Sequence, residues 1–82
     1  MKITITVRNC IENKEYDIQV DHQKRIGTTL RVLGENIPEI LEGMQEKFIL
    51  KSYRNKRRVN PDETYEHEMI FNGDMLLIQN MQ

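Results

Sequence analysis

Residues 1–37 read MKITITVRNCIENKEYDIQVDHQKRIGTTLRVLGENI, and they decide the fold because the spacing of their apolar residues changes part-way along. In the first part an apolar residue recurs at every second position, in two runs: Ile3, Ile5, Val7 and then Tyr16, Ile18, Val20. That period is typical of strands with one buried face. A short polar segment that contains Asn9 and Asn13 joins the two runs. Together they predict a β-hairpin closed by a loop.

Beyond the hairpin the spacing becomes that of a helix. Four apolar residues follow at intervals of four, three and four, which places them on one helical stripe: Ile26, Leu30, Leu33 and Ile37. Asp21 is the expected N-cap, because its carboxylate can accept hydrogen bonds from the free amides of a first turn. Asn36 can adopt the left-handed conformation that ends a helix, and Pro38 prevents continuation. The sequence therefore predicts a helix from about His22 to about Glu35.

The second half of the chain predicts shorter strands separated by turns. Residues 48–53 are rich in apolar and aromatic side chains, Val59 begins a short strand, and residues 75–79 form a last strand. Residues 72–74, Asn-Gly-Asp, form a sharp turn in which Gly73 supplies a positive φ. A hairpin, one helix and later strands require the helix to pack across one face of a mixed sheet. We predict an α+β fold of the β-grasp type, with four or five strands on one helix, in a single domain spanning residues 1–82.

The composition narrows the class of protein. The 82 residues carry a formal net charge of -1, which gives no overall attraction to nucleic acid or to an anionic membrane. Cys10 is the only cysteine, so an internal disulfide is impossible and a reducing compartment is favoured. The alternating N-terminus differs from a signal peptide, and no apolar run is long enough to span a bilayer. We expect a cytoplasmic protein that does not insert directly into a membrane.

No motif in the sequence predicts catalysis. His22 and His67 have no Cys, Asp or Glu partner at metal-ligand spacing, and we expect both to be polar surface residues. Cys10 lies in the hairpin loop, where a nucleophile would need a base and a pocket. No phosphate-binding glycine loop, dinucleotide fingerprint or His-Glu-x-x-His motif occurs. We expect no enzymatic activity, no cofactor, no metal and no small-molecule substrate.

Several segments resemble ubiquitin in their spacing. Residues 1–5, Met-Lys-Ile-Thr-Ile, are similar to its first strand, and residues 36–38, Asn-Ile-Pro, resemble the Gly-Ile-Pro that ends its helix. Four apolar residues match the spacing of its buried Leu, Ile, Leu and Leu: Tyr65, Ile70, Leu76 and Ile78. The resemblance covers residues 2–79 and implies the same β-grasp fold.

Within that fold the chain resembles the bacterial YukD/EsaB family, small ubiquitin-like proteins associated with type VII secretion. The shared features are the size and the segment at residues 70–76, Ile-Phe-Asn-Gly-Asp-Met-Leu. The resemblance implies an accessory or regulatory component that supports export of small helical-hairpin substrates. It implies a protein partner from the secretion system, and no functional residue of the family transfers by position.

The end of the sequence departs from ubiquitin. Ubiquitin and the sulfur carriers of this fold act through a C-terminal Gly-Gly, whereas residues 79–82 read Gln-Asn-Met-Gln. We therefore expect neither conjugation to targets nor sulfur transfer. A sulfur carrier or modifier with a truncated tail remains the alternative if the native chain continues beyond Gln82.

Strand parity predicts a protein-binding face. If Phe48 and Leu50 face the helix, the alternate residues of their strand face outward, and the last strand follows the same rule. Ile11, Ile49 and Leu77 then fall on positions that lie in or beside the apolar recognition patch of ubiquitin. The predicted protein-binding residues are Arg8, Ile11, Ile49, Lys51, Tyr53, Leu77 and Gln79. The alternatives are scattered exposed side chains or the contact of a weak homodimer, and we expect a monomer or such a dimer.

A basic patch is predicted at the turn after residue 53. It consists of Arg54, Lys56, Arg57 and Arg58. Such a cluster is typical of a solvated turn whose charge prevents edge pairing, and it could also bind an acidic protein or nucleic acid. Nucleic acid is disfavoured because Tyr53 is the only nearby aromatic platform and the chain as a whole is not basic.

Overall fold

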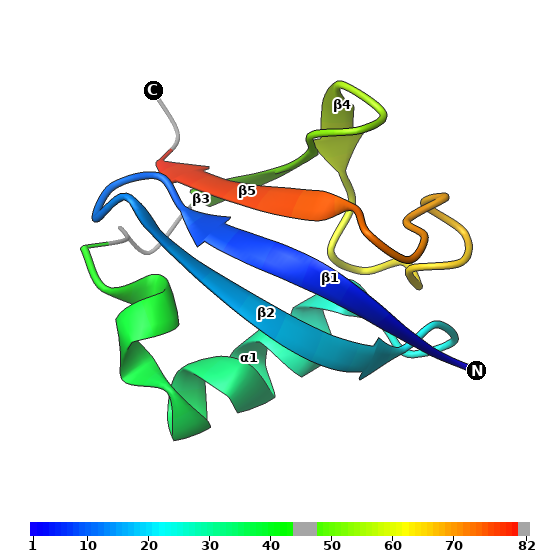
Figure 1. Ribbon diagram of the computed structural model, residues 1–82, viewed down its shortest axis with the longest axis horizontal. Coiled ribbons are helices and arrows are strands. Elements are labelled where there is room, and N and C mark those ends of the chain that lie inside the picture. Colours follow the sequence, from blue (N-terminus) through cyan, green and yellow to red (C-terminus); the bar gives the residue numbers. More distant parts are fainter. Residues whose placement is uncertain (44–47, 81–82) are drawn as a thin grey trace.

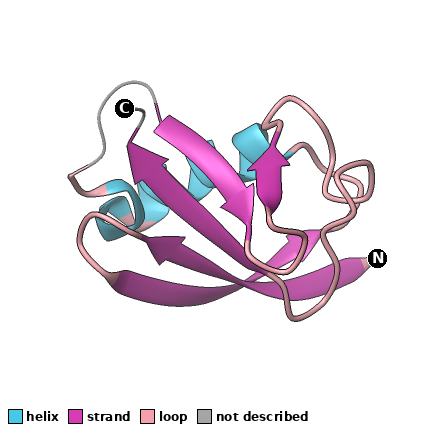
Figure 2. Ribbon diagram, turned by 90° about the horizontal axis from the view of Figure 1, so that it is seen from above, coloured by secondary structure: helices cyan, strands magenta, loops and turns pink. Residues whose placement is uncertain are grey.

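The computed structural model describes residues 1–43 and 48–80, which build one sheet with helical segments on one face (Figures 1 and 2). The elements are β1 (Lys2–Asn9), β2 (Lys14–Asp21), α1 (Ile26–Asn36), the 3-10 helix η1 (Pro38–Leu41), β3 (Phe48–Ser52), β4 (Arg57–Val59) and β5 (Met75–Asn80). The five strands lie in the order β2-β1-β5-β3-β4. All neighbours are antiparallel except β1 and β5, whose arrows lie side by side and point the same way in Figure 1. This arrangement confirms the predicted α+β, β-grasp fold.

The core lies between the sheet and α1. It gathers buried apolar side chains from every strand, from both helices and from the loop before β5: Ile3, Ile5, Val7, Ile18, Val20, Ile26, Leu30, Ile40, Leu50, Val59, Tyr65, Ile70, Leu76 and Ile78. In Figure 2 the helices lie behind the strands, so one sheet face is covered and the other is open. Leu50, Leu76 and Ile78 point to the covered face, which confirms the predicted parity of β3 and β5.

The start of the helix was predicted incorrectly. α1 begins at Ile26, and its N-cap residue Arg25 makes no capping hydrogen bond through its side chain. Asp21 instead accepts a hydrogen bond from the amide of Gln23 at 2.9 Å, so it closes a local turn rather than the helix. The first helical amides are satisfied by the distant loop, with Ile26 donating to the carbonyl of Glu63 at 3.0 Å. These tertiary partners replace the side-chain cap that the sequence suggested.

The end of the helix also differs in detail. Asn36 is the last helical residue and does not adopt a positive φ, while Ile37 donates its amide to the carbonyl of Leu33 at 2.6 Å. Of the predicted stripe, Ile26 and Leu30 are buried, whereas Leu33 and Ile37 pack partly exposed against the core. Pro38 follows the end of α1, as expected, and starts the single 3-10 turn η1, which supplies Ile40 to the core.

One of the two histidines is buried, contrary to the prediction. His22 is 5% exposed, and its Nε2 lies 2.9 Å from the carbonyl oxygen of Ile70. Its ring also packs against Phe71. His67 is at the surface as expected, with Glu63 at 3.9 Å. The burial of His22 was not predicted because it depends on contacts with the loop before β5 and on a continuation of the β1–β2 ladder past Asp21. In that continuation the amide of His22 donates a hydrogen bond to the carbonyl of Met1 at 2.8 Å.

The predicted turn at residues 72–74 is confirmed, and it organises three strands. Gly73 has a φ of +88°, which glycine adopts without strain. Asn72 accepts a hydrogen bond from the amide of Thr4 at 2.7 Å, which ties the turn to β1. Asp74 is 1% exposed and accepts from the hydroxyl of Ser52 at 2.7 Å and from the amide of Arg54 at 3.1 Å. The carboxylate therefore fixes the start of β5 to the turn after β3.

No helix among residues 1–43 and 48–80 has the length and apolar character needed to cross a bilayer. Met81 and Gln82 lie outside the described residues.

Candidate protein-binding face

The open face of the sheet, which we call the outer face, carries an aligned row of residues that crosses all five strands. The pairing registers place them in the order Glu15, Arg8, Leu77, Lys51 and Arg58. Leu77 stands at the centre, between two buried neighbours on β5 that point to the core. A single apolar side chain thus lies between two basic ones on adjacent strands.

A hollow adjoins this row and gathers four of the predicted binding residues. It is an open depression of about 450 Å³ lined by Ile11, Ile49, Lys51, Gln79 and Asn80. Ile49 lies opposite Gln79 in the β3–β5 register, and Ile11 reaches it from the hairpin loop. Ile11 is 45% exposed, while Ile49 and Leu77 are partly exposed. The structure therefore brings together the apolar residues that the sequence assigned to one face.

Asn9 positions the hairpin loop, a role that the sequence pattern did not predict. It is fully buried, and its side-chain amide donates to the carbonyls of Ile40 at 3.0 Å and Glu42 at 2.8 Å. Its side-chain oxygen accepts from the amides of Ile11 at 2.9 Å and Glu12 at 3.1 Å. Asn9 thus connects the loop that carries Ile11 to η1. The available signal was its parity, since it continues the inward alternation of Ile3, Ile5 and Val7.

The backbone of Gly43 packs closely against Ile11. A Cβ atom at this position would lie 2.8 Å from the Cγ2 of Ile11, and the glycine φ is +80°. Both the space and the backbone conformation require glycine here. Ile11 therefore contacts Gly43 with one side of its side chain and lines the hollow as well.

Some charged side chains of the outer face are engaged in ion pairs within the part of the protein that the structure describes, and others are not. The Nη1 of Arg8 lies 2.6 Å from Glu15 Oε2, and its Nη2 donates to the side chain of Asn13, so the β2 side of the row is internally neutralised. Within the described residues, neither Lys51 nor Arg58 forms an ion pair. The β3–β4 side of the face is consequently its basic side, and the β2 side carries exposed Glu15 and Asp17.

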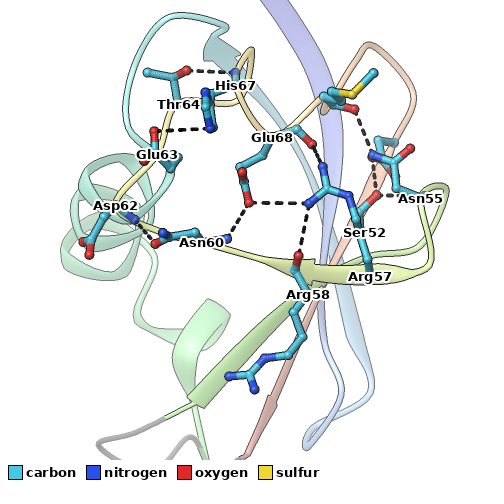
Figure 3. A network of polar contacts seen from close by, with 12 residues as sticks. Ser52, Asn55, Arg57, Arg58, Asn60, Asp62, Glu63, Thr64, His67 and Glu68 are labelled. Carbon is cyan, nitrogen blue, oxygen red and sulfur yellow. Dashed lines mark hydrogen bonds and ion pairs between the residues drawn. The ribbon is translucent and has the colours of Figure 1, made fainter.

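One residue of the predicted basic patch, Arg57, bonds to a buried glutamate, and the other three are exposed cations. Figure 3 shows the guanidinium of Arg57 pointing at Glu68, where Nη2 donates to the carbonyl oxygen at 2.5 Å and Nη1 lies 3.7 Å from Oε1. Glu68 is buried and also accepts from the amide of Asn60 at 2.7 Å. Arg57 therefore ties β4 to the following loop. Arg54, Lys56 and Arg58 remain as exposed cations.

Tyr53 lies with two of these cations rather than in the first hollow. It is 65% exposed, and a second depression of about 410 Å³ is lined by Tyr53, Arg54, Lys56, Gly73, Asp74 and Met75. Of the seven residues predicted for protein binding, four line the first hollow, Tyr53 lines the second depression, and Arg8 and Leu77 lie in the row that crosses the strands. Their use in binding stays a prediction.

Two ionisable groups have shifted pKa values. Burial raises the pKa of the Tyr65 hydroxyl, and its hydrogen bond with Thr29 opposes that shift. The hydrogen bond from the amide of Gln23 lowers the pKa of Asp21. Neither group belongs to the outer face. Among the described residues, no group of three or more His, Cys, Asp or Glu side chains could hold a metal ion.

Comparison with known proteins shows the fold and leaves the family open. No protein-family model matches the chain, and no curated protein matches it. Solved structures do match: a de novo design based on ubiquitin has a TM-score of 0.72 at 20% identity, over 95% of this chain and 87% of that chain. A Caldiarchaeum subterraneum ubiquitin has a TM-score of 0.70 at 13% identity, over 100% of this chain and 96% of that chain. The ubiquitin-like domain of an Arabidopsis thaliana protein has a TM-score of 0.68 at 14% identity, over 99% of this chain and 79% of that chain. The chain therefore has a ubiquitin-like β-grasp fold.

Proposed function

We propose that this protein is a non-catalytic interaction module that docks on a partner protein through its outer face. The observation that carries the proposal is the hollow in which Ile11 and Ile49 lie beside Lys51. Protein-binding surfaces commonly combine a partly exposed apolar centre with a polar rim, and this face has both. Binding would act by occupancy, without a covalent change in either protein.

The partner we propose is a component of a bacterial type VII secretion apparatus, which the module would serve from the cytoplasm as an accessory or regulatory subunit. The support is the resemblance of residues 70–76 to the YukD/EsaB family. In this chain Asn72 and Asp74 hold β1, β3 and β5 in register, so the residues that carry the resemblance also shape the proposed docking face.

The docking proposal is tested by capture of partners with matched surface variants. Ile49→Glu and Leu77→Glu place a carboxylate on the outer face, whereas Met69→Glu changes a 57% exposed apolar residue in the loop before β5. We expect the first two variants to lose the partner captured by the wild type, with affinity reduced more than about tenfold, and Met69→Glu to retain it.

Backbone NMR spectra establish whether each variant is folded. If Ile49→Glu and Leu77→Glu are folded and bind as well as the wild type, the outer face is not the docking site. If the captured partner is unrelated to secretion, the interaction role stands and the secretion role is wrong.

Nucleic-acid binding is the second candidate, because Tyr53 lies beside Arg54 and Lys56 in one depression. Base stacking on an aromatic ring with cations for the phosphates is how single strands are bound without sequence preference. This function requires affinity that falls steeply with salt, with a logarithmic slope of about -0.7 per phosphate for single strands. We expect no such binding at physiological salt, as measured by fluorescence anisotropy, because Arg57 is engaged by Glu68 and few free cations remain.

A further inference from the structure

The sheet has two edges, and they differ in how they are protected. One edge is β4, which is three residues long and is joined to the following loop by Arg57 (Figure 3). The other edge is β2, which is eight residues long and contains no proline. Within residues 1–43 and 48–80, β1 is the only strand that pairs with β2. A long open edge is a template for another strand.

The hydrogen-bond pattern shows which groups of β2 face outward. Even-numbered residues of β1 bond toward β5, since Thr6 donates to the carbonyl of Asp74 at 3.0 Å and Thr4 accepts from Gly73 at 2.8 Å. Odd-numbered residues of β1 therefore bond toward β2, where the register pairs Ile3 with Val20 and Ile5 with Ile18. It follows that the N–H and C=O groups of Glu15, Asp17 and Gln19 point away from the sheet.

An apolar depression lies beside this edge on the helix side. It has a volume of about 330 Å³ and lies between β2 and α1, lined by Gln19, Val20, Asp21, Lys24, Thr28, Thr29, Val32 and Leu33. Val32 is 45% exposed although it belongs to a helix that packs on the core. A strand added to β2 would direct every second side chain into this depression.

The charges beside the edge indicate what the added strand must carry. Asp17 is exposed on the outer side of β2 and Asp21 is the last residue of the strand, while the carboxylate of Glu15 is already paired with Arg8. The intervening side chains of an added strand would lie next to these carboxylates, so basic residues fit there. The same carboxylates oppose a second copy of this chain. An antiparallel pairing of two β2 edges through their outward groups would place Asp17 against Asp17, Asp17 against Asp21, or Glu15 against Asp21.

We propose that β2 and α1 form a second binding site, which takes an extended segment of a partner protein as an added strand. The segment alternates apolar residues, which contact Val20, Val32 and Leu33, with basic residues, which lie beside Asp17. Main-chain bonds to Asp17 and Gln19 supply the affinity, and the side chains supply the specificity. This site is separate from the outer-face hollow and does not depend on the function proposed for it.

The test uses the full chain, labelled with ¹⁵N, and two synthetic peptides, Lys-Val-Lys-Val-Lys-Val and Glu-Val-Glu-Val-Glu-Val. We expect the lysine peptide to shift amide signals of β2 and α1 and to slow hydrogen exchange at Asp17 and Gln19. The glutamate peptide should bind at least about tenfold more weakly because it meets the same carboxylates.

Gln19→Pro removes one outward N–H and leaves the bonds to β1 in place, since proline is tolerated where an edge N–H faces solvent. We expect at least about tenfold weaker binding of the lysine peptide by this variant and by Val32→Glu, with Met69→Glu unchanged. Val32→Glu keeps the test decisive if Gln19→Pro does not fold. The proposal is overturned if the lysine peptide gives no shifts at about 1 mM, if the shifts map to β3 and β5, or if folded Val32→Glu binds normally.

Discussion

Single buried polar residues control how the outer face is presented. Asn9 occupies an inward position of β1, where the neighbouring inward residues are apolar, and its side chain bonds to backbone groups of two segments, the hairpin loop and residues 40–42. Such groups lose their partners together if the amide is removed, and each unsatisfied buried group is costly. The position of Ile11 therefore depends on a residue that does not itself reach the surface.

Asn9→Ala should lower the free energy of unfolding by about 1–3 kcal/mol, because carbonyls of η1 and amides of the hairpin loop lose their partners. Urea denaturation measures the change, with Gln23→Ala at an exposed position as the control. A variant as stable as the wild type would show that water replaces these hydrogen bonds without cost.

Tyr65 makes stability depend on pH at the alkaline end. Its side chain is fully buried, and burial raises its pKa above the value of about 10 that it has when unfolded. The neutral hydroxyl is the form that the folded state favours. The resulting stabilisation is therefore fully present below about pH 10 and is lost as the pH rises through the folded pKa.

Tyr65→Phe should consequently show a shallower loss of stability above about pH 10 than the wild type. At neutral pH it should be less stable by about 1 kcal/mol, because the hydrogen bond between Tyr65 and Thr29 is lost while Thr29 keeps its bond to the carbonyl of Ile26. Denaturation midpoints across the alkaline range test this, with Tyr53→Phe at an exposed position as the control. Parallel curves for wild type and Tyr65→Phe would contradict the assignment.

At the scale of elements, α1 depends on its neighbours more than on its own sequence. Its first turn is satisfied by the carbonyls of Glu63 and Pro61, and its glycines lie where other segments approach. A Cβ on Gly27 would lie 3.0 Å from the carbonyl oxygen of Pro61, and one on Gly34 would lie 2.7 Å from Leu41. At Gly27 the close atom belongs to the backbone, so packing favours glycine there although helix propensity alone would favour alanine, whereas at Gly34 the close atom is the end of a flexible side chain.

Gly27→Ala should therefore destabilise the protein, although alanine gains about 1 kcal/mol of helix propensity. The crowding against backbone, at about 1–3 kcal/mol, outweighs that gain. Thr28→Ala, on the exposed side of the same turn, should be neutral or slightly stabilising. The melting temperatures of both variants test this prediction. A Gly27→Ala variant that is more stable than the wild type would show that the loop at Pro61 moves away from the added methyl group at little cost.

The sequence predicted the elements wherever the periodicity was sustained. The alternation of β1 and β2 and the parity of β3 and β5 follow from local spacing, and the structure confirms them. The start of α1 and the burial of His22 could not be predicted, because both depend on the loop that precedes β5. Asp21 resembled a helix N-cap because its carboxylate accepts a hydrogen bond from a backbone amide two residues later, and the same kind of bond occurs in a local turn and at the start of a helix.

The whole molecule presents an outer face whose cations are concentrated on one side. Leu77 and the neighbouring hollow lie between the β2 side, where Glu15 is paired with Arg8 and Asp17 is exposed, and the basic β3–β4 side. The candidate residues came together because parity on β3 and β5 sets one face for both strands. The engagement of Arg57 by Glu68 could not be predicted, since it joins residues on either side of a loop without periodic spacing.

This distribution of charge should guide association more than it sets affinity. We expect the association rate with the partner to fall as salt is raised, since Arg54 and Arg58 are exposed on one side and Lys51 is partly exposed there, while the dissociation rate changes little. Stopped-flow measurements over a range of salt concentrations separate the two rates. A dissociation rate that rises with salt while association is constant would place the charged groups within the buried interface.

The most direct test of the outer-face proposal is an NMR titration of the ¹⁵N-labelled chain with its captured partner. We expect the amide signals of Ile11, Ile49, Leu77 and Gln79 to change most, and those on the solvent side of α1 to stay in place. Changes confined to α1 and the loop before β5, with the outer-face signals unmoved at saturation, would contradict the account.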